Sequence, residues 1–310
     1  MNVKMSYSFK DIKKKTNDTT FVYTDLSYET SDGSWLNFET RLRRRGNYRL
    51  KNCYFPPIKF KAKKKKVAGT VFEGNKTLKI VMPCLMQKDN SDNVVKEYLA
   101  YKLYELISPY HFKTRLMTLA LTEQRGSKVR EHNVKAFFIE DDKQVAKRFD
   151  ARVYKRNNHP LNHDPVESVR NALFMYMIGN TDFSQTYQHN MQIIFVGTSI
   201  IPLPFDFDMS GLVNSSYAVV SQIKGQDLGL SSVKERMYRG FVRDEAVFYQ
   251  VRQEYIDLKP EIIKLLDDHA KYFDNPKEFS SAKEYILSCY NVLANKERFK
   301  KEIIDRARNE

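Results

Sequence analysis

Residues that favour burial alternate with polar ones along the first half of the chain. The residues at positions 36, 38, 40 and 42 alternate with polar neighbours, which is typical of a half-buried strand. Enrichment in β-branched and aromatic residues predicts further strands at 19–30, 58–62, 77–82, 115–122 and 134–139. Residues 1–18 are polar and rich in lysine, so we expect a loose or edge segment there.

Helical spacing of apolar residues predicts one helix inside this sheet, over 89–107. After residue 150 the pattern becomes mainly helical. Asp164-Pro165 is a strong helix start, and the apolar face that follows it ends at Gly179. Further helices are expected at 232–238, 244–258, 260–272, 280–293 and 296–308. We therefore predict two domains, a β-rich lobe over 1–150 and a mainly helical lobe over 151–310.

The stretch from residue 180 to residue 211 concentrates polar groups around two apolar runs. Asp182 follows the helix, His189-Asn190 precede the first run, and Asp206 and Asp208 follow the second. Carboxylates and an amide suit Mg²⁺ or Mn²⁺, and they suit positioning a hydroxyl for attack on a phosphoryl group. A capped turn is the simpler alternative for the last two acids, but they would repel one another without a cation or hydrogen-bond donors.

The first half of the chain contains a second pair of candidate functional residues, a lysine and a glutamate. Lys79 lies within a predicted strand, and Glu97 lies in the first turns of the predicted helix. A lysine in a strand points to water by default. A β-rich lobe with one helix, followed by a helical lobe, is however the layout of a protein kinase-like fold. In that fold a strand lysine contacts nucleotide phosphates and a helix glutamate holds it.

The Arg-Arg-Arg-Gly-Asn loop at 43–47 is open to two interpretations. A basic loop with a glycine can hold phosphates through guanidinium groups and backbone N–H groups, which makes Arg45 and Gly46 candidates for nucleotide binding. A solvated hairpin corner explains the same residues, and one glycine alone favours that simpler interpretation.

Several short motifs resemble the spore coat protein H (CotH) family of atypical kinases, especially its divergent bacterial branch. They are RRRGN at 43–47, FPPIKF at 55–60, TLKIVMPC at 77–84, EYLAYKLY at 97–104, GNTDFS at 179–184, HN at 189–190 and PFDFDMSGLV at 204–213. The last three are the most specific. Together the motifs span residues 43–213, about half of the chain.

This resemblance implies an α+β, atypical kinase-like fold and transfer of a phosphoryl group from Mg-ATP to protein Ser/Thr or another hydroxyl acceptor. It implies Asp182 as the catalytic-loop acid, Asn190 as a metal ligand and Asp206 as the principal metal-binding acid. Asp208 is then the alternative or a second ligand. Lys79 is the expected phosphate contact, with Lys59 as its competitor and Glu97 as the partner of that lysine.

The chain also departs from ordinary protein kinases. It has no His-Arg-Asp, no glycine-rich loop and no Asp-Phe-Gly, and Asp182 and Asn190 are eight residues apart. Atypical kinases tolerate such changes, and so do pseudokinases. An inactive pseudokinase therefore stays open as an alternative.

Two further functions are alternatives, and the first of them follows from the charge of the chain. The formal net charge is +14 and the pI is about 9.4, which favours acidic partners. A module that binds nucleic acid or another acidic polymer through its basic segments is one alternative, although no recognised nucleic-acid motif supports it. A metal-dependent nuclease built on Asp182, Asp206 and Asp208 is the other.

The remaining features bear on location. No apolar run reaches the roughly 20 residues of a membrane span, and the first residues lack the apolar core of a secretory signal. A cytoplasmic location is expected, or an exported one if a leader has been removed. Cys53 and Cys84 bracket two strands, and paired antiparallel strands would bring them together. Two buried thiols are expected in the cytosol, and a disulfide in an exported chain.

Overall fold

The computed structural model describes residues 1–46, 48–86, 89–156, 158–225 and 227–309. The chain divides into two compact units. The first unit combines Met1–Tyr98 with Lys113–Gln144, and the second combines Leu99–Phe112 with Val145–Glu310. Each unit is described below by itself.

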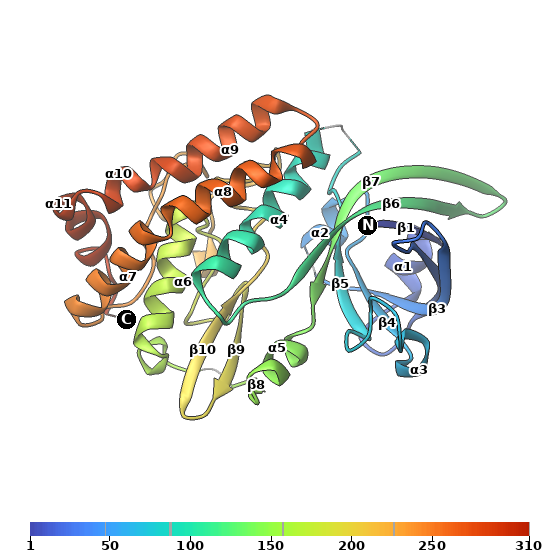
Figure 1. Ribbon diagram of the computed structural model, residues 1–310, viewed down its shortest axis with the longest axis horizontal. Helices are drawn as coiled ribbons and strands as arrows, with labels where there is room; N and C mark the ends of the chain where they lie inside the picture. Colours follow the sequence, from blue (N-terminus) through green and yellow to red (C-terminus); the bar gives the residue numbers. More distant parts are fainter. Residues whose placement is uncertain (47, 87–88, 157, 226, 310) are drawn as a thin grey trace. The chain divides into compact units, whose positions relative to one another are not determined.

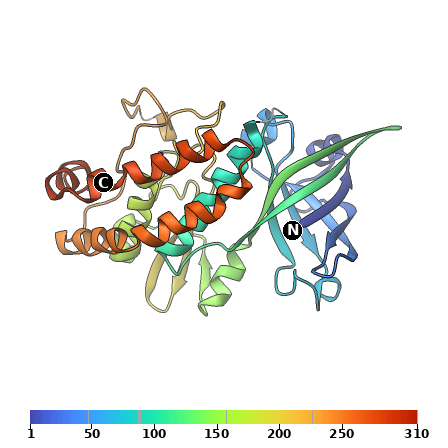
Figure 2. The ribbon, with the colours of Figure 1, turned by 45° about the horizontal axis from the view of Figure 1, so that its top comes forward.

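The first unit is built on a closed barrel of seven strands, drawn from blue to green in Figure 1. The strands are β1 (Asn2–Tyr7), β2 (Val22–Glu29), β3 (Trp35–Arg44), β4 (Ile58–Ala62), β5 (Thr77–Val81), β6 (Thr114–Arg125) and β7 (Lys128–Glu140). Their order around the barrel is β1-β2-β3-β4-β5-β7-β6. Neighbours are antiparallel except β1 and β6, which run parallel and close the sheet. The hairpin of β6 and β7 extends beyond the other strands in both views (Figures 1 and 2).

The predicted kinase-like fold, with a β-rich lobe containing one helix and a mainly helical lobe, is therefore wrong. The finding that overturns it is the closed mixed barrel. The difference lies in residues 1–18, which were expected to be a loose or edge segment but contain β1 and the helix α1 (Phe9–Lys15). Val3, Met5 and Tyr7 alternate with exposed or half-buried neighbours and are buried. This short period-2 pattern lies among lysines, and it supplies the strand that closes the barrel.

Aromatic side chains fill the barrel. The Phe72 ring, from the loop before β5, lies 5.4 Å from the rings of Tyr28, Phe38 and Phe138. All four rings are buried, and edge-to-face contacts of this kind add stability beyond the buried area. The barrel is thus a packed core closed by a loop residue. Besides α1, the short helices α2 (Tyr48–Asn52) and α3 (Lys64–Val67) and the start of α5 (Asp142–Arg148) accompany it.

Cys53 and Cys84 form a disulfide with a Cα–Cα distance of 4.5 Å. Of the two alternatives that the sequence left open, the structure has the disulfide. The pairing follows from the register, because β4 and β5 are antiparallel neighbours and the two cysteines flank them at one end. The Tyr54 N–H also donates to the Cys84 carbonyl at 2.8 Å, so backbone and side-chain links coincide. Cys289 is a buried free cysteine.

The helix α4 (Asp89–Ile107) confirms the predicted inserted helix, and the chain passes from one unit to the other within it. The second unit holds a three-stranded sheet in the order β10-β9-β8. Its strands are β8 (Arg152–Tyr154), β9 (Met191–Val196) and β10 (Ser199–Pro204). Its helices are α6 (Pro165–Met177), α7 (Glu245–Asp257), α8 (Lys259–His269), α9 (Pro276–Ser288), α10 (Tyr290–Leu293) and α11 (Lys296–Phe299). Short 3₁₀ or π turns lie at Pro160–Asn162, Ile223–Gly225, Ala270–Tyr272 and Lys300–Ile304.

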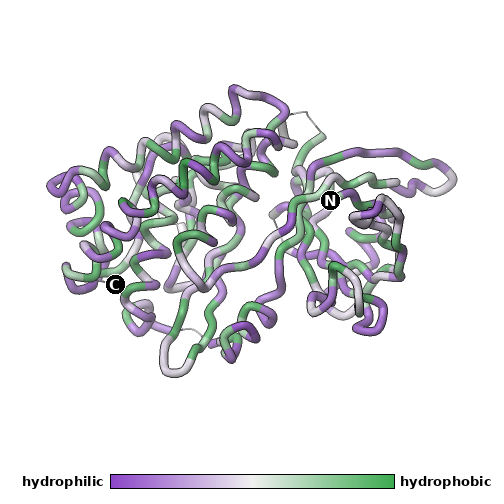
Figure 3. Tube along the Cα trace, viewed as in Figure 1, coloured by the Kyte–Doolittle hydropathy of each residue, from purple (hydrophilic) through white to green (hydrophobic). Residues whose placement is uncertain are grey.

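Helix α6 is the buried axis of this unit and packs against α7 and β10. It begins as predicted, because the Asp164 carboxylate accepts from the Glu167 N–H at 3.0 Å and Pro165 occupies the first turn. The outer helices α8 and α9 are amphipathic, and Figure 3 shows hydrophilic and hydrophobic residues alternating along them. Among the described residues, no helix combines the length and apolar character needed to cross a bilayer.

One predicted helix is absent. Residues 232–238 form no helix. Two of their polar side chains instead make contacts with backbone groups and with a ring outside this segment. The Glu235 carboxylate accepts from the backbone N–H groups of Ser231 and Ser232, which closes a turn. The Arg236 guanidinium donates to the Met177 carbonyl at 3.1 Å and stacks 4.0 Å from the centre of the Tyr285 ring. These tertiary contacts override the local helical pattern.

Candidate active site

A hairpin brings the two halves of the predicted site together. Strands β9 and β10 are joined at the Gly197 turn, and their pairing sets Met191 opposite Pro204. Beyond that pair the Phe205 N–H donates to the Asn190 carbonyl at 3.1 Å. The residue before β9 therefore lies beside the residues that follow β10. This register places Asn190 and Asp206 at the same end of the hairpin.

Asp182 reaches this end through the turn that terminates α6. Gly179 has a φ of +62°, a conformation that glycine adopts without penalty. Its carbonyl accepts from the Gly211 N–H at 3.0 Å, which links the turn to the segment after Asp208. A Cβ on Gly179 would collide with the Tyr285 hydroxyl. Glycine is thus required here both by the backbone and by the close approach of Tyr285.

Three side chains hold the Asp182 carboxylate. The Asn190 amide donates to its Oδ2 at 2.9 Å and also to the Asp182 carbonyl at 2.7 Å. The Ser221 hydroxyl donates to Oδ1 at 3.2 Å, and His189 Nε2 lies 3.3 Å from the same oxygen. The side chain keeps 22% of its surface exposed. The carboxylate is therefore oriented by its neighbours and still open to a second molecule.

His189 shows that Asp206 belongs to the same group. The hydrogen bond with Asp182 raises the pKa of His189, and the negative charges of Asp182 and Asp206 act in the same direction against its partial burial. Asp206 is thus close enough to affect the imidazole. Two acids and a histidine, from three segments of the chain, share one electrostatic environment.

The backbone at this site adopts an unusual conformation. Asn190 has a φ of +50° and Asp206 a φ of +65°. A left-handed conformation costs a residue other than glycine about 1 kcal/mol or more, and such residues cluster at functional sites. The Asp206 N–H donates to the Tyr101 hydroxyl at 3.0 Å, which helps to hold that conformation. The surrounding structure therefore fixes the residue that sequence analysis predicted as the principal metal ligand.

Asp208 has a different environment from Asp206. It is buried, with 5% of its surface exposed. Its Oδ2 accepts from the Tyr217 hydroxyl at 3.1 Å, and its carbonyl accepts from Ser215 at 3.1 Å. Binding a metal through that oxygen would cost the bond with Tyr217. Of the two acids, Asp206 is the more accessible ligand.

The residues at the hairpin end fit Mg²⁺ only as part of a mixed shell. No group of three His, Cys, Asp or Glu side chains in the described part of the chain is placed to hold an ion. Mg²⁺ commonly takes one or two protein ligands, with water and substrate phosphates completing its shell. The Asp206 carboxylate and the Asn190 amide oxygen match that requirement. These residues suit a metal that arrives with a nucleotide better than a resident ion.

In the first unit, the two candidate lysines lie directly opposite one another. Lys59 on β4 pairs with Lys79 on β5, and Lys79 pairs with Ile139 on its other side. Their strand neighbours Phe60 and Ile80 are buried, so both lysines are on the outer face of the barrel. Lys59 Nζ lies 2.7 Å from the Asp141 carboxylate. Lys59 is thus held by an acid of its own unit.

Glu97 is buried, and its Oε2 lies 3.7 Å from Arg49 Nη1. Arg49 Nη2 in turn donates to the Met82 carbonyl at 2.6 Å. Sequence analysis did not foresee Arg49, which lies on the short helix α2. The expected pairing of Glu97 with Lys79 stays a prediction.

The basic loop is partly described. The Arg45 N–H donates to the Pro57 carbonyl at 3.0 Å. Its buried Nε has no hydrogen-bond partner in the part of the chain that the structure describes. Gly46 has a φ of +65°, and Asn47 lies outside the described residues. Phosphate binding by Arg45 and Gly46 stays a prediction.

Three residues of the site were not found from the sequence. Ser221, Tyr101 and Arg239 reach it from distant segments. Arg239 is buried, its guanidinium donates to the Thr181 carbonyl, and burial, followed by the charge of Arg308, lowers its pKa to about 10. No local pattern marks these residues, because their roles depend on contacts 39 or more positions away along the chain.

Comparison with known proteins gives no further guide. No family model matches the chain, and no curated protein is significantly similar to it.

Proposed function

We propose that this chain is a phosphotransferase that moves the γ-phosphoryl group of Mg-ATP to a hydroxyl acceptor, either protein Ser/Thr or a small molecule. The observation that carries the proposal is the Asp182 carboxylate, which is held by Asn190, His189 and Ser221 and is still partly exposed. The resemblance of the surrounding motifs to the CotH family adds support. The proposal rests on this chemistry and requires no kinase fold.

Asp182 would act on the acceptor. Its carboxylate orients the hydroxyl and takes the proton as the oxygen attacks the γ-phosphorus. The bond to the bridging oxygen breaks and ADP leaves. Bound Mg²⁺ would offset charge on the phosphates, with Asp206 and Asn190 as the residues that hold it and Asp208 as the alternative ligand. Lys79, or Lys59 in its place, stays the predicted phosphate contact.

The test separates chemistry from binding. Asp182→Asn is expected to lower metal-dependent transfer from radiolabelled ATP by about 10²- to 10⁴-fold, the range for loss of a general base. The thermal shift produced by Mg-ATP should remain, and Asp206→Ala should weaken it. Asp257→Asn, on an exposed position of α7, is the matched control and should change neither. A wild-type chain with no nucleotide-induced shift in Mg²⁺ or Mn²⁺ contradicts the proposal. Binding without transfer would instead indicate an inactive relative.

A second candidate function is binding of an acidic polymer, including nucleic acid. It is favoured by two basic residues set opposite one another on the barrel, Arg41 and Lys61. Arg41 and Lys61 also lie 5.2 and 5.8 Å from the centre of the Phe21 ring. Like charges in register destabilise a sheet unless an anion offsets them. Lys61→Gln should then reduce the salt dependence of binding by about one counterion. An unchanged salt dependence contradicts this second function.

A further inference from the structure

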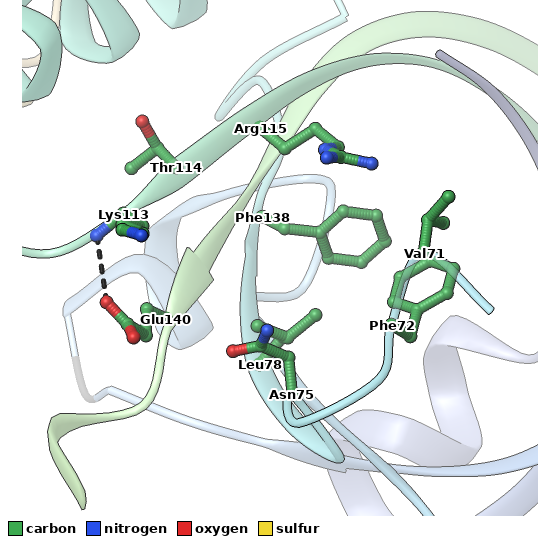
Figure 4. A pocket seen from close by; sticks show the side chains of 9 residues that line it. All are labelled: Val71, Phe72, Asn75, Leu78, Lys113, Thr114, Arg115, Phe138 and Glu140. Carbon is green, nitrogen blue, oxygen red and sulfur yellow. Dashed lines mark hydrogen bonds between the residues drawn. The ribbon is translucent and has the colours of Figure 1, made fainter. Parts of the chain in front are cut away.

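The mouth of the barrel contains a cavity of about 180 Å³. It lies where β5 and β6 begin and β7 ends, and the loop before β5 forms its other wall (Figure 4). The lining residues are Val71, Phe72, Asn75, Leu78, Lys113, Thr114, Arg115, Phe138 and Glu140. All of them belong to the first unit. None of the lining residues belongs to the site around Asp182.

Strand register explains why charged and aromatic residues meet there. Residues directly opposite one another in neighbouring strands point to the same face. Arg115 pairs with Phe138, and Leu78 pairs with Glu140. Phe138 and Leu78 belong to the core inside the barrel. Arg115 and Glu140 therefore extend the inward-facing rows to the open end, where the core gives way to solvent.

The floor of the cavity is aromatic. The rings of Phe72 and Phe138 lie 5.4 Å apart and are nearly perpendicular, at 88°. Figure 4 shows Phe138 at the centre, with Phe72 and Val71 facing it from the loop. A flat ring that enters this space meets both an aromatic face and an aromatic edge, the two arrangements that aromatic pairs prefer. The walls thus favour a planar apolar body.

The rim of the cavity is basic. Arg115 is exposed, and its guanidinium has no hydrogen-bond or ion-pair partner within the described residues. The side chain of Lys113 is exposed as well, while its backbone N–H donates to the Glu140 carboxylate at 3.0 Å. Two cations and one carboxylate leave the rim with one positive charge in excess. The planar guanidinium fork matches a carboxylate in size and geometry.

The cavity volume is sufficient for a single ring. A closed apolar cavity of about 150 Å³ accepts benzene, and a water molecule occupies about 30 Å³ of liquid. The remaining space above one ring suits one small polar group at the rim. We propose that the barrel mouth is a binding site for a small aromatic monocarboxylate, with the ring on Phe72 and Phe138 and the carboxylate on Arg115 and Lys113. This site is independent of the proposed transferase activity.

Phenylacetate is the probe, and isothermal titration calorimetry on the whole chain is the measurement. We expect saturable binding with a dissociation constant at or below about 5 mM, as ten non-hydrogen atoms allow. The neutral amide, phenylacetamide, should bind at least about tenfold more weakly, because it cannot form the charged pair with Arg115. Acetate alone should show no saturation, since it lacks the ring.

Two variants test the residues. Arg115→Gln should weaken phenylacetate binding at least about tenfold. Lys128→Gln, at the other end of the same hairpin and also exposed, is the matched control and should bind as the wild type does. Val71→Trp should fill the cavity and abolish binding. Val71 is 50% exposed, so this change spares the core, and circular dichroism checks the fold.

Three results would overturn the inference. One is a wild-type chain that does not bind phenylacetate in a saturable way. Another is equal affinity for the acid and its amide. The third is unchanged binding in the folded Arg115→Gln and Val71→Trp variants. None of these measurements depends on ATP, so failure of this inference is distinguishable from failure of the proposed transfer activity.

Discussion

The interior of the barrel and the region behind Asp182 bury different kinds of side chain. The barrel is filled with apolar and aromatic residues, such as Phe60, Phe72 and Phe138, and a disulfide ties two of its strands. Behind Asp182, the second unit buries amides instead, and Asn171, Asn180 and Gln185 are 0% exposed. Gln185 donates to Asn171 at 3.3 Å, and Asn180 accepts from the Asp182 N–H at 2.9 Å.

The two interiors differ in how strictly they constrain the identity of their side chains. Apolar cores tolerate exchange of side chains of similar volume. Buried polar groups must keep their partners, because an unpaired one costs about 1–3 kcal/mol. We therefore infer that the barrel supplies stability and that the polar interior of the second unit supplies orientation. The following predictions test that division, beginning with the largest expected effect.

Removing the disulfide tests how much the barrel owes to its covalent link. The double variant Cys53→Ala, Cys84→Ala is expected to lose about 3–4 kcal/mol of unfolding free energy, because the bond closes a separation of 31 residues. Urea unfolding measures the loss. Cys289→Ala, in the other unit, is the control for removal of a buried thiol. A loss below 1 kcal/mol in the double variant would contradict the role given to the link.

Gly179→Ala tests the backbone of the second unit. We expect a loss of about 2–3 kcal/mol, because the new Cβ collides with Tyr285 in a left-handed turn. Gly197→Ala is the matched control. Gly197 also has a positive φ, of +55°, but its Cβ would meet nothing within 4 Å, so only the conformational cost of about 1 kcal/mol applies. Equal losses in thermal or urea unfolding would remove the argument for close approach.

Lowering the pH should reduce the stability of the second unit because of His163. This histidine is 1% exposed, and neither ring nitrogen has a hydrogen-bond partner within the described residues. Burial, then the charge of Arg243 and the proximity of His159, lowers its pKa to about 4. Below the unfolded pKa of about 6.5 the unfolded chain binds a proton that the folded chain does not, so stability falls as the pH falls.

Between pH 7.5 and pH 5 this one group should cost about 2 kcal/mol of unfolding free energy. Urea unfolding at the two pH values measures the slope in the wild type and in His163→Gln. The variant should lose that part of the pH dependence, while His132→Gln, in the barrel, serves as the comparison. The same slope in wild type and His163→Gln would show that another group is responsible.

Ser221→Ala gives the smallest expected effect and the most specific one. The variant removes one of three partners of Asp182, so transfer should fall by about three- to tenfold, equivalent to about 1 kcal/mol. The unfolding free energy should change by less than that. Ser231→Ala, in an exposed turn, is the control. A stability loss larger than the loss of rate would assign Ser221 to the fold instead of the site.

Patterns of neighbouring residues predict correctly those elements that short-range interactions determine. The Asp164-Pro165 start of α6 and the helix α4 are both present. The hairpin of β9 and β10 joins two adjacent strands, and its register brings Asn190 beside the residues that follow β10. Near-neighbour information is enough for these features.

The rest depends on partners far away in the sequence. Closure of the barrel pairs Val3 with Leu119, and no window of neighbouring residues contains that pairing. Ser221 reaches Asp182 across 39 positions. Arg236 contacts Met177 and Tyr285, and its own segment forms no helix despite its helical pattern. Long-range contacts decided each case in which the sequence misled.

The strand β1 has a consequence for how the chain behaves among copies of itself. It covers the edges of both β2 and β6, so the barrel presents no free strand edge there. Loss of residues 1–7, by proteolysis or truncation, would uncover two rows of unpaired backbone groups at once. Such edges recruit strands from other molecules. The strand β1, Asn2–Tyr7, thus reduces the tendency of the barrel to aggregate through its strand edges.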